Sequence, residues 1–433
     1  MTVRLATILG SLTGINVLLT FIYQWYIVTI IGPGTETDSF FASMVVPQLI
    51  LTVVTGSLIF VLVPILATEQ DDSFHQETWN FFLAIGVLFS VTTVILYLTT
   101  NYWVPMTVPG FSPHSKTLTI ALTKIQLVGM LFTALAGVLG AAYNAKQQFV
   151  WVSLSPVFST IIGLIFLVCL LPRMGVMAAA WAMVLKMFIQ MALLLPILGK
   201  FKRLDFESIA FKKAWTKLKP LLLGNTYSKT DQLIDRFLAS MAPMGELSLL
   251  HLSQQIYGAG NQVITSAIAS PMVPLLAQKA SSGEWNTFKD ISKKRLSVVV
   301  WLTGIILLVI IVIGRPILSV VFGHGRFLAA QLQYFWLILI ALAGVLIGGA
   351  MGQILSTSFY AKGNTHTPTK IGVIGFSIGI VLKLTGFNLF GVIGVALANS
   401  IYLFLNAFIM QYYLTKNLEI LIHAPNIVSK TRF

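Results

Sequence analysis

The chain has 433 residues, of which 56% are apolar and 10% charged, and its formal net charge is +14. Its mean hydropathy of +0.86 is far above that of a protein that folds in water. This composition excludes most soluble enzymes and nucleic-acid-binding proteins and predicts an integral membrane protein.

Apolar runs of about 20 residues recur along the chain, and each is long enough to cross a hydrocarbon core of about 30 Å. We expect twelve transmembrane helices, near residues 5–32, 38–67, 78–100, 117–143, 149–172, 175–199, 218–242, 247–278, 292–314, 331–359, 367–389 and 391–415. The first apolar stretch runs from Arg4 to Ile31, which is too long for a cleaved signal sequence, so we expect it to be the first span. The loops between the helices are too short to hold a soluble catalytic domain.

Basic residues are distributed unevenly between the loops on the two sides of these helices. With the N-terminus inside, most of the 28 Lys and Arg residues fall on the cytoplasmic side, and the other side holds Lys116, Arg173, Arg315 and Arg326. An even number of helices returns the C-terminus to the cytoplasm. The basic clusters at 200–219 and 279–295 therefore indicate membrane orientation, and we expect no nucleic-acid partner.

The sequence contains an internal repeat. A shift of 210 residues aligns Pro33 with Pro243, Glu36 with Glu246, Ser43 with Ser253 and Pro64 with Pro274, and a shift of 216 aligns Ala145-Lys146 with Ala361-Lys362 and Gly175-Val176 with Gly391-Val392. Two six-helix repeats in the same direction predict a two-lobed transporter fold with a site between the lobes. We predict an N-terminal lobe at 1–199, a basic cytoplasmic linker at 200–217, and a C-terminal lobe at 218–433 with a short cytoplasmic tail.

Motifs for catalysis or metal binding are missing from the sequence. The six histidines are scattered with no HExxH pair, and Gly323-His324-Gly325 lacks the lysine of a phosphate-binding loop. The single cysteine, Cys169, cannot form an internal disulfide or a cysteine-based metal site. We expect no enzyme activity, no catalytic residue, no cofactor and no metal.

Charged residues inside the predicted helices are the best candidates for function, because each costs several kcal/mol unless it is paired or hydrated. Those that lie away from the helix ends are Lys124, Lys186, Lys229, Asp231, Asp235, Arg236 and Lys383. The four on the seventh helix form either a salt-bridge patch between packed helices or the lining of a wet cavity, and we favour the cavity. Lys186 lies near the midplane and either faces the space between the lobes or bonds a carbonyl within its own lobe, whereas Lys124 is near enough to a helix end to reach the interface.

Polar residues on the first and eighth helices complete the candidate site. Gln24, Gln255 and Asn261 could contact a substrate, although hydrogen bonds between helices use the same residue types. We therefore predict substrate-binding residues Lys186, Lys229, Arg236, Gln255, Gln24 and Asn261, and a charge network of Asp231, Asp235 and Lys383.

Several motifs, in order and spacing, resemble those of the MurJ/MviN family of lipid II flippases in the MOP exporter superfamily. They are the stretch 32–42 (GPGTETDSFFA), Val46-Pro47, Val63-Pro64, the stretch 235–240 (DRFLAS), Pro271-Met272-Val273-Pro274, the stretch 321–327 (VFGHGRF) and the stretch 359–368 (FYAKGNTHTP). The resemblance spans nearly the whole chain.

The resemblance implies a flippase that moves a polyprenyl-pyrophosphate-linked saccharide across the bacterial inner membrane by alternating access, as part of peptidoglycan and cell-wall biosynthesis. It also implies membrane lipid and cell-envelope biosynthesis proteins as partners. The alternatives are a flippase for another lipid-linked polysaccharide unit, a drug/cation antiporter of the same superfamily, and a structural role without transport. The absence of an acid at depth in the first lobe disfavours the antiporter.

The sequence departs from the family pattern in three ways. The family's cavity arginines on the first two helices have no counterpart, its arginine on the eighth helix falls on Gln255, and its two further C-terminal helices have no match. In sodium-dependent members the resemblance implies an ion site whose positions fall on Asp235, Gly379 and Lys383. We expect Lys383 to pair with Asp235 in place of sodium, unless Lys383 turns toward the headgroups and Asp235 pairs only with Arg236.

Overall fold

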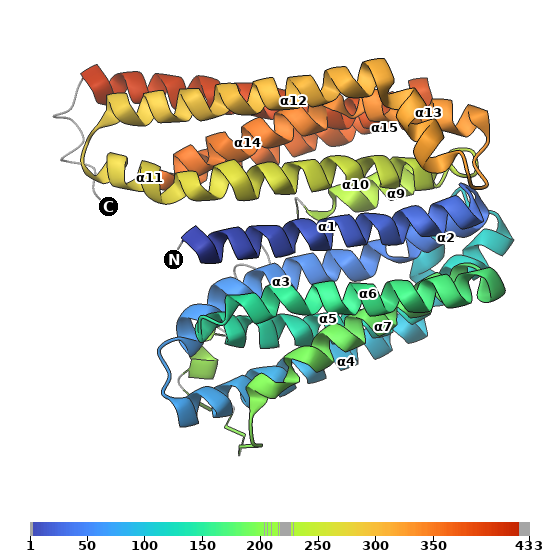
Figure 1. Ribbon diagram of the computed structural model, residues 1–433, viewed down its shortest axis with the longest axis horizontal. Coiled ribbons are helices and arrows are strands. Elements are labelled where there is room, and N and C mark those ends of the chain that lie inside the picture. The colour runs from blue at the N-terminus through green and yellow to red at the C-terminus, as the bar shows by residue number, and fades with distance from the viewer. Residues whose placement is uncertain are drawn as a thin grey trace. The chain divides into compact units, whose positions relative to one another are not determined.

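The computed structural model describes residues 3–202, 204–205, 207–208, 210–214, 216, 227 and 229–423. Every regular element within these residues is a helix (Figure 1). Nine helical segments of the described chain are long and apolar enough to cross a membrane. The prediction of an all-α, multi-pass membrane protein is confirmed.

The described chain divides by its internal packing into two compact units, Met1–Ser248 and Leu249–Phe433. The first unit contains α1 (Val3–Ile31), α2 (Thr35–Ser43), α3 (Val45–Leu66), α4 (Asp71–Thr107), α5 (Pro113–Ala145), α6 (Phe149–Met174), α7 (Val176–Leu194), η1 (Leu195–Leu198), α9 (Asp231–Ala239) and the start of α10 (Glu246–Ile264). The central element is α5, which contacts α2, α3, α4, α6 and α7.

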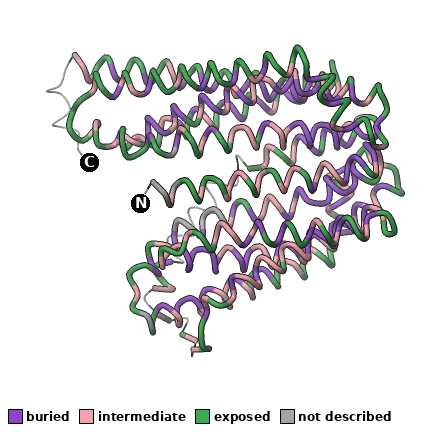
Figure 2. The backbone as a smooth tube through the Cα atoms, in the orientation of Figure 1, coloured by how far each residue is buried: buried purple, intermediate pink, exposed green. Residues whose placement is uncertain are grey.

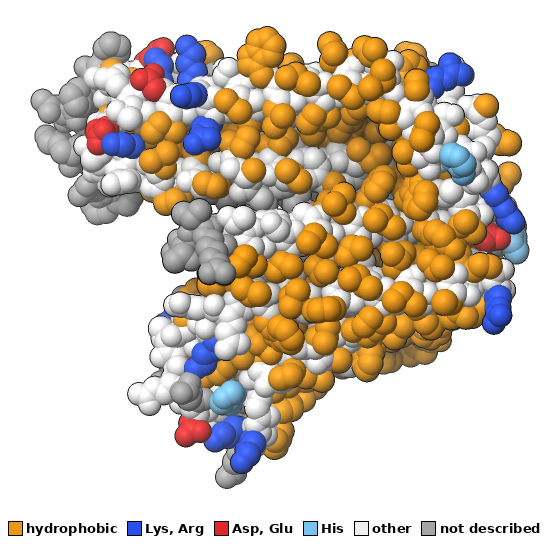
Figure 3. Space-filling model, in the orientation of Figure 1, with side chains coloured by type: hydrophobic (Ala, Val, Ile, Leu, Met, Phe, Trp, Pro, Cys, Tyr) orange, Lys and Arg blue, Asp and Glu red, His pale blue; other side chains and the backbone are white. Residues whose placement is uncertain are grey.

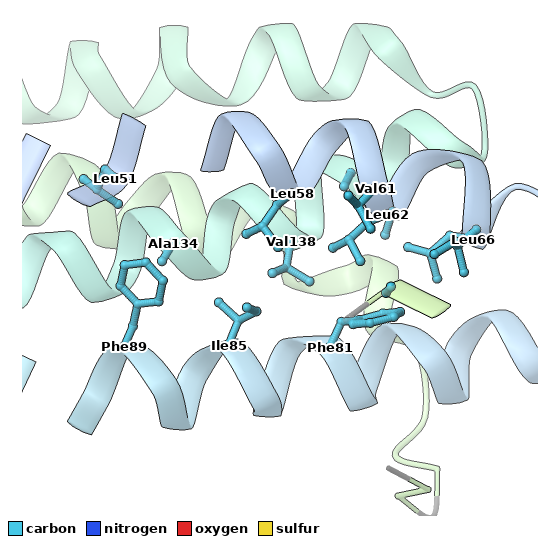
Figure 4. Close-up of a cluster of buried hydrophobic side chains, with 14 of the residues drawn as sticks. Leu51, Leu58, Val61, Leu62, Leu66, Phe81, Ile85, Phe89, Ala134 and Val138 are labelled. Atoms are coloured by element: carbon cyan, nitrogen blue, oxygen red, sulfur yellow. The ribbon is translucent and has the colours of Figure 1, made fainter. Parts of the chain in front are cut away.

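The core of the first unit lies between α3, α4 and α5 (Figure 4). Leu58 and Leu62 of α3 meet Phe81, Ile85 and Phe89 of α4, and all five are buried. Small residues on α5, including Ala134 and Val138, let the three helices approach closely. Close packing of this kind holds helices together where the surrounding lipid is as apolar as the helices themselves.

The second unit contains the rest of α10, the π-helical turn η2 (Thr265–Ala269), α11 (Ser270–Ser281), α12 (Trp285–Phe322), α13 (Ala329–Ala341), α14 (Ala343–Ala361) and α15 (His366–His423). Its central element is α14, which contacts α11, η2, α12, α13 and α15. By the repeat, α14 corresponds to the end of α5. The fourth helix of each repeat therefore forms the centre of its unit.

The internal repeat is also visible in the backbone. Gly175 joins α6 to α7 with φ of 56°, and Gly391, its equivalent at a shift of 216, interrupts α15 with φ of 58°. The two ψ angles, −143° and −138°, also agree. Because α15 contains this break, it comprises the two helices predicted at 367–389 and 391–415.

Several predicted helices differ from the observed ones in length or continuity. The polar ends of α4 and α12 continue as helix past the apolar run, so both exceed the predicted spans 78–100 and 292–314. The helix predicted at 38–67 is interrupted at Met44, and that predicted at 331–359 is interrupted at Leu342. The helix predicted at 247–278 contains the π-turn η2 just before Pro271, a proline whose missing N–H cannot complete regular helical pairing.

The segment between the repeats packs against the first unit where it is described. The side chain of Asn80 on α4 donates to the Asp205 carbonyl at 2.9 Å and accepts from the Asp205 N–H at 2.9 Å. The Phe211 ring stacks on Phe81 with centroids 5.5 Å apart. Of the helix predicted at 218–242, residues 218–226 and 228 lie outside the described residues. The division into lobes 1–199 and 218–433 with a cytoplasmic linker stays a prediction.

Side-chain types follow the pattern of a membrane protein on the face drawn in Figure 3. Hydrophobic side chains occupy the middle of each unit, and charged side chains gather toward its ends. The burial pattern agrees, since long apolar helices such as α12 carry exposed residues along their length (Figure 2). Trp301 and Val320 of α12, for example, are 72% and 70% exposed. Exposed apolar side chains at this density indicate contact with lipid.

The equivalence of Gly175 and Gly391 gives a stability test. We expect Gly391→Ala to lower the free energy of unfolding by about 1 kcal/mol, because a side chain is strained at this positive φ. Gly372→Ala is the matched control, since Gly372 lies in the same helix with a helical φ and has open space where a Cβ would be added. Thermal unfolding in detergent should show a lowered midpoint for the first variant and an unchanged or raised one for the control.

Candidate functional site

A buried carboxylate lies near the start of α2. Asp38 is 4% exposed and accepts three hydrogen bonds, from the Gly245 N–H at 2.6 Å, from the Ser248 N–H at 2.8 Å and from the Ser248 hydroxyl. We call Asp38, Gly245 and Ser248 the Asp38 latch. Three donors on one carboxylate replace the water that burial removes.

The latch depends on the start of α10. The first N–H groups of a helix have no partner inside the helix, and the end of the helix dipole there favours a negative charge. Asp38 therefore caps α10 (Glu246–Ile264) with a carboxylate from a distant part of the sequence. Gly245 has φ of 94°, and a Cβ there would lie 3.0 Å from the backbone of Pro33, so this position requires glycine.

The latch joins equivalent positions of the two repeats. At the shift of 210 residues that aligns Pro33 with Pro243, Asp38 aligns with Ser248. The contact between the two stretches extends beyond these residues, because the Thr35 hydroxyl lies 3.0 Å from the Met244 sulfur. Contacts between equivalent positions form where equivalent segments of two copies of a structure pack against each other.

A buried arginine extends the charge group. Arg236 and Asp235 on α9 are 4% and 1% exposed, and Arg236 interacts electrostatically with both Asp235 and Asp38. The guanidinium therefore lies within electrostatic range of two carboxylates. Charges at such depth stay ionised only when they are paired in this way.

A small polar pocket lies beside the latch. Its volume is about 260 Å³, and it is lined by Thr35, Asp38, Gly110, Phe111, Ser112, Ser115, Ser240, Ala242 and Met244. Gly110, in the loop between α4 and α5, packs directly on the backbone of Ser240 and Met241, where any side chain would collide. The segment 240–248 is thus held by α2 on one side and by this loop on the other.

The predicted site residues of the first unit occupy different environments. Lys186 on α7 is partly buried, and its Cβ packs against α6 at Gly163. Gln24 on α1 is partly buried, and its Oε1 has no hydrogen-bond partner among the described residues. Lys229 is exposed, and Asp231 is partly buried at the first turn of α9. The structure places Arg236 within electrostatic range of both Asp235 and Asp38.

The predicted site residues of the second unit lie on α10 and α15. Asn261 donates to the Val345 carbonyl at 3.2 Å, a bond between α10 and α14, while Gln255 is partly buried. Lys383 is fully buried, with its Nζ 5.6 Å from the centre of the Tyr402 ring. Whether Lys383 pairs with Asp235 or turns toward the headgroups stays a prediction.

The sequence interpretation missed the Asp38 latch. Asp38 was part of a recognised motif but was placed at a helix start, where an acidic residue is ordinary. The signal that could have found it is the repeat itself, since the 210-residue shift aligns Asp38 with Ser248 and so predicts proximity wherever equivalent segments meet. No sequence pattern pointed to Gly110, because what matters at this position is the absence of a side chain, which allows close backbone packing.

Comparison with known proteins identifies the family. The model of the family described as lipid II flippase MurJ matches residues 27–431. The chain belongs to the lipid II flippase MurJ family. The resemblance inferred from the motifs is thereby confirmed, and so is the expectation of a transporter rather than an enzyme.

Individual relatives are distant but cover most of the chain. A probable lipid II flippase MurJ of Vibrio cholerae is 24% identical over 420 residues, covering 92% of this chain and 80% of that protein. A probable lipid II flippase MurJ of Rickettsia prowazekii is 22% identical, and the alignment covers 97% of this chain and 85% of that protein.

Solved structures agree on the fold. A lipid II flippase MurJ in an inward closed conformation superposes with a TM-score of 0.82 at 19% identity, covering 95% of this chain and 89% of that one. A multidrug resistance MATE transporter of the MOP superfamily gives a TM-score of 0.79 at 12% identity, covering 97% and 99%. The predicted MOP-type transporter fold is confirmed.

The latch can be tested at the backbone it caps. Asp38→Asn keeps the size of the side chain but removes its charge, and a hydrogen bond to a charged group contributes about 1.5–3 kcal/mol. We expect amide hydrogen exchange at residues 245–248 to become at least about tenfold faster. The control is Asp72→Asn, because Asp72 is 93% exposed in an ion pair with Lys202 and should leave this segment unchanged. Equal exchange in all three proteins would contradict the capping role.

Proposed function

We propose that this protein is a flippase that moves a polyprenyl-pyrophosphate-linked saccharide, lipid II or a close analogue, across the bacterial inner membrane by alternating access. The observation that carries the proposal is the family match over residues 27–431, joined with the MOP-type fold. The protein is a multi-pass membrane protein, and its substrate is a lipid-linked molecule.

The charges at membrane depth support an anionic substrate. Away from the ends of the predicted spans, the chain holds five cations, Lys124, Lys186, Lys229, Arg236 and Lys383, against two acids, Asp231 and Asp235. Among the described residues, Asp38 adds a third acid, but its carboxylate already binds two N–H groups and a hydroxyl. A positive surplus attracts a pyrophosphate more readily than the organic cations carried by drug antiporters. We infer that Lys186 and Arg236, together with Lys229, attract this group, while Gln24, Gln255 and Asn261 contact the rest of the headgroup.

A second candidate is a flippase for another lipid-linked polysaccharide unit. The observation that favours it is Gln255, which stands where the family carries an arginine and gives the site one cation fewer. Comparing transfer of lipid II with that of a polyprenyl-pyrophosphate oligosaccharide, in the same vesicles, separates the two functions.

Replacing Lys186 tests the anionic site. We expect Lys186→Met to lower leaflet transfer of a labelled lipid-linked glycan in vesicles by about tenfold, because one charged contact to the pyrophosphate is lost. The matched control is Lys124→Met, since Lys124 is the other lysine within the spans of the predicted N-terminal lobe, 1–199, and its Nζ lies 5.2 Å from the centre of the Tyr97 ring. Equal transfer by both variants and the wild type would remove Lys186 from the site.

We propose that transport is independent of sodium. The α15 positions that the family resemblance assigns to sodium are occupied by other groups, because the Tyr402 ring fills the space beside Gly379 and lies next to Lys383. Pairing of Lys383 with Asp235 would supply the positive charge that sodium otherwise brings. The membrane potential, about 2.3 kcal/mol per charge per 100 mV, or a proton would then drive transport.

Sodium replacement tests this proposal. Transfer by the wild-type protein should be the same in sodium and potassium buffers, and Lys383→Asn should make it depend on sodium. Lys416→Asn, which changes an exposed lysine of the same helix, should behave as the wild type. Strong sodium dependence in the wild type contradicts the proposal.

We propose that both termini and residues 200–217 are cytoplasmic and that residues 32–38 face the opposite side. The support is the excess of Lys and Arg in the loops placed on the cytoplasmic side. In a Cys169→Ala background, cysteines replacing Lys213 and Glu36, both exposed, should react with an impermeant reagent from opposite sides of the membrane. Lys294→Cys serves as a second cytoplasmic reference. Labelling of all three from one side would overturn this orientation.

A further inference from the structure

A groove runs along the two arms of α15 within the second unit. The arms, 366–390 and 392–423, are separated by the break at Gly391. The groove has a volume of about 380 Å³ and is lined by His366, Thr367, Lys370, Ile371, Ile374, Gly375, Ile378, Tyr402, Leu405, Asn406, Ile409 and Tyr413. Its size falls within the range of about 300–1,000 Å³ typical of small-molecule sites.

The spacing of the lining residues makes the groove long and narrow. On the first arm they recur every three or four positions from 366 to 378, which is one face of a helix. At 1.5 Å per residue this face is about 18 Å long. The arms are antiparallel, because Asn406 packs on Gly375 and Tyr402 on Gly379. A length of about 18 Å is close to half of a hydrocarbon core of about 30 Å, the depth of one leaflet.

The walls of the groove are apolar and open to the surroundings. Ile374 and Ile378 of the first arm are 50% and 48% exposed, and Leu405, Ile409 and Tyr413 of the second are 47%, 42% and 46% exposed. In a helix that spans the membrane, such residues face lipid rather than water. The occupant of these walls is therefore hydrocarbon.

One end of the groove is basic. Lys370 and His366 lie at the start of α15, and no acidic residue lines the groove. Thr367 adds a hydroxyl, which accepts from the Asn364 side-chain amide at 3.0 Å. An ammonium, an imidazole N–H and a hydroxyl at the end of an apolar channel match a phosphate followed by an acyl chain.

We propose that this groove binds an anionic phospholipid, with its phosphate at Lys370 and His366 and one acyl chain between the arms of α15. A zwitterionic lipid brings its own cation near Lys370 and fits this end less well. The site lies within the second unit, and Tyr402 is the one lining residue that also enters the transport proposals. Its occupancy can therefore be measured whether or not the proposed transport is correct.

Native mass spectrometry of the full-length protein in detergent tests the headgroup contact. We expect phosphatidylglycerol to bind about tenfold more tightly than phosphatidylcholine, and the double variant His366→Gln, Lys370→Gln to reduce this preference to near unity. The double variant Lys294→Gln, Arg295→Gln is the control, because it removes two exposed cations of α12 that do not line the groove. The control should retain the preference.

A second pair of variants tests the acyl-chain contact. Ile374→Trp fills the groove and should weaken phosphatidylglycerol binding several-fold. Val373→Trp adds the same bulk at the adjacent position, which is 42% exposed but does not line the groove, and should have no effect. Equal wild-type affinity for both lipids would overturn the proposal, as would equal losses in test and control variants. Displacement of phosphatidylglycerol by equimolar undecaprenyl diphosphate would also overturn it, because the groove would then be a substrate site.

Discussion

The first unit depends on the buried carboxylate of Asp38 on α2, which caps the start of α10, a helix about 210 residues further along the chain. Asp38 is nearly inaccessible, so its charge persists only because Gly245 and Ser248 donate to it and Arg236 lies near it. These bonds fix the segment 240–248 against α2, and the absence of a side chain at Gly110 lets the α4–α5 loop close over the same segment. This explains why the first compact unit continues to Ser248, beyond the first sequence repeat.

Sequence reasoning predicted the features that leave a recurring pattern in the sequence, either apolar runs or an internal repeat. Apolar runs predicted the spans, and the repeat aligned Gly175 with Gly391, whose backbone angles match. Helix ends were predicted less well, because the polar ends of α4 and α12 carry no hydropathy signal yet continue the helix. The Asp38 latch was missed because a carboxylate at a helix start usually stabilises the N-terminus of its own helix. The sequence does not show that Asp38 instead accepts hydrogen bonds from Ser248, 210 residues away.

The charges within the spans differ in how they are accommodated, and this bears on function. Arg236 lies within electrostatic range of two carboxylates, Lys383 is buried near the Tyr402 ring, and Lys186 is partly buried against Gly163. The first two each have a neighbouring group inside the protein that stabilises their charge. Lys186 is the better candidate for contact with a substrate phosphate, because among the described residues no salt bridge is found for it.

The claim that Asp38 and Ser248 act as one unit is tested most directly by a double-mutant cycle. Unfolding free energies in detergent would be measured for the wild type, Asp38→Asn, Ser248→Ala and the double variant. Because the carboxylate accepts the Ser248 hydroxyl, we predict that the double variant loses about 1–3 kcal/mol less than the two single losses combined. Additive losses, with no coupling between the two positions, would contradict the account.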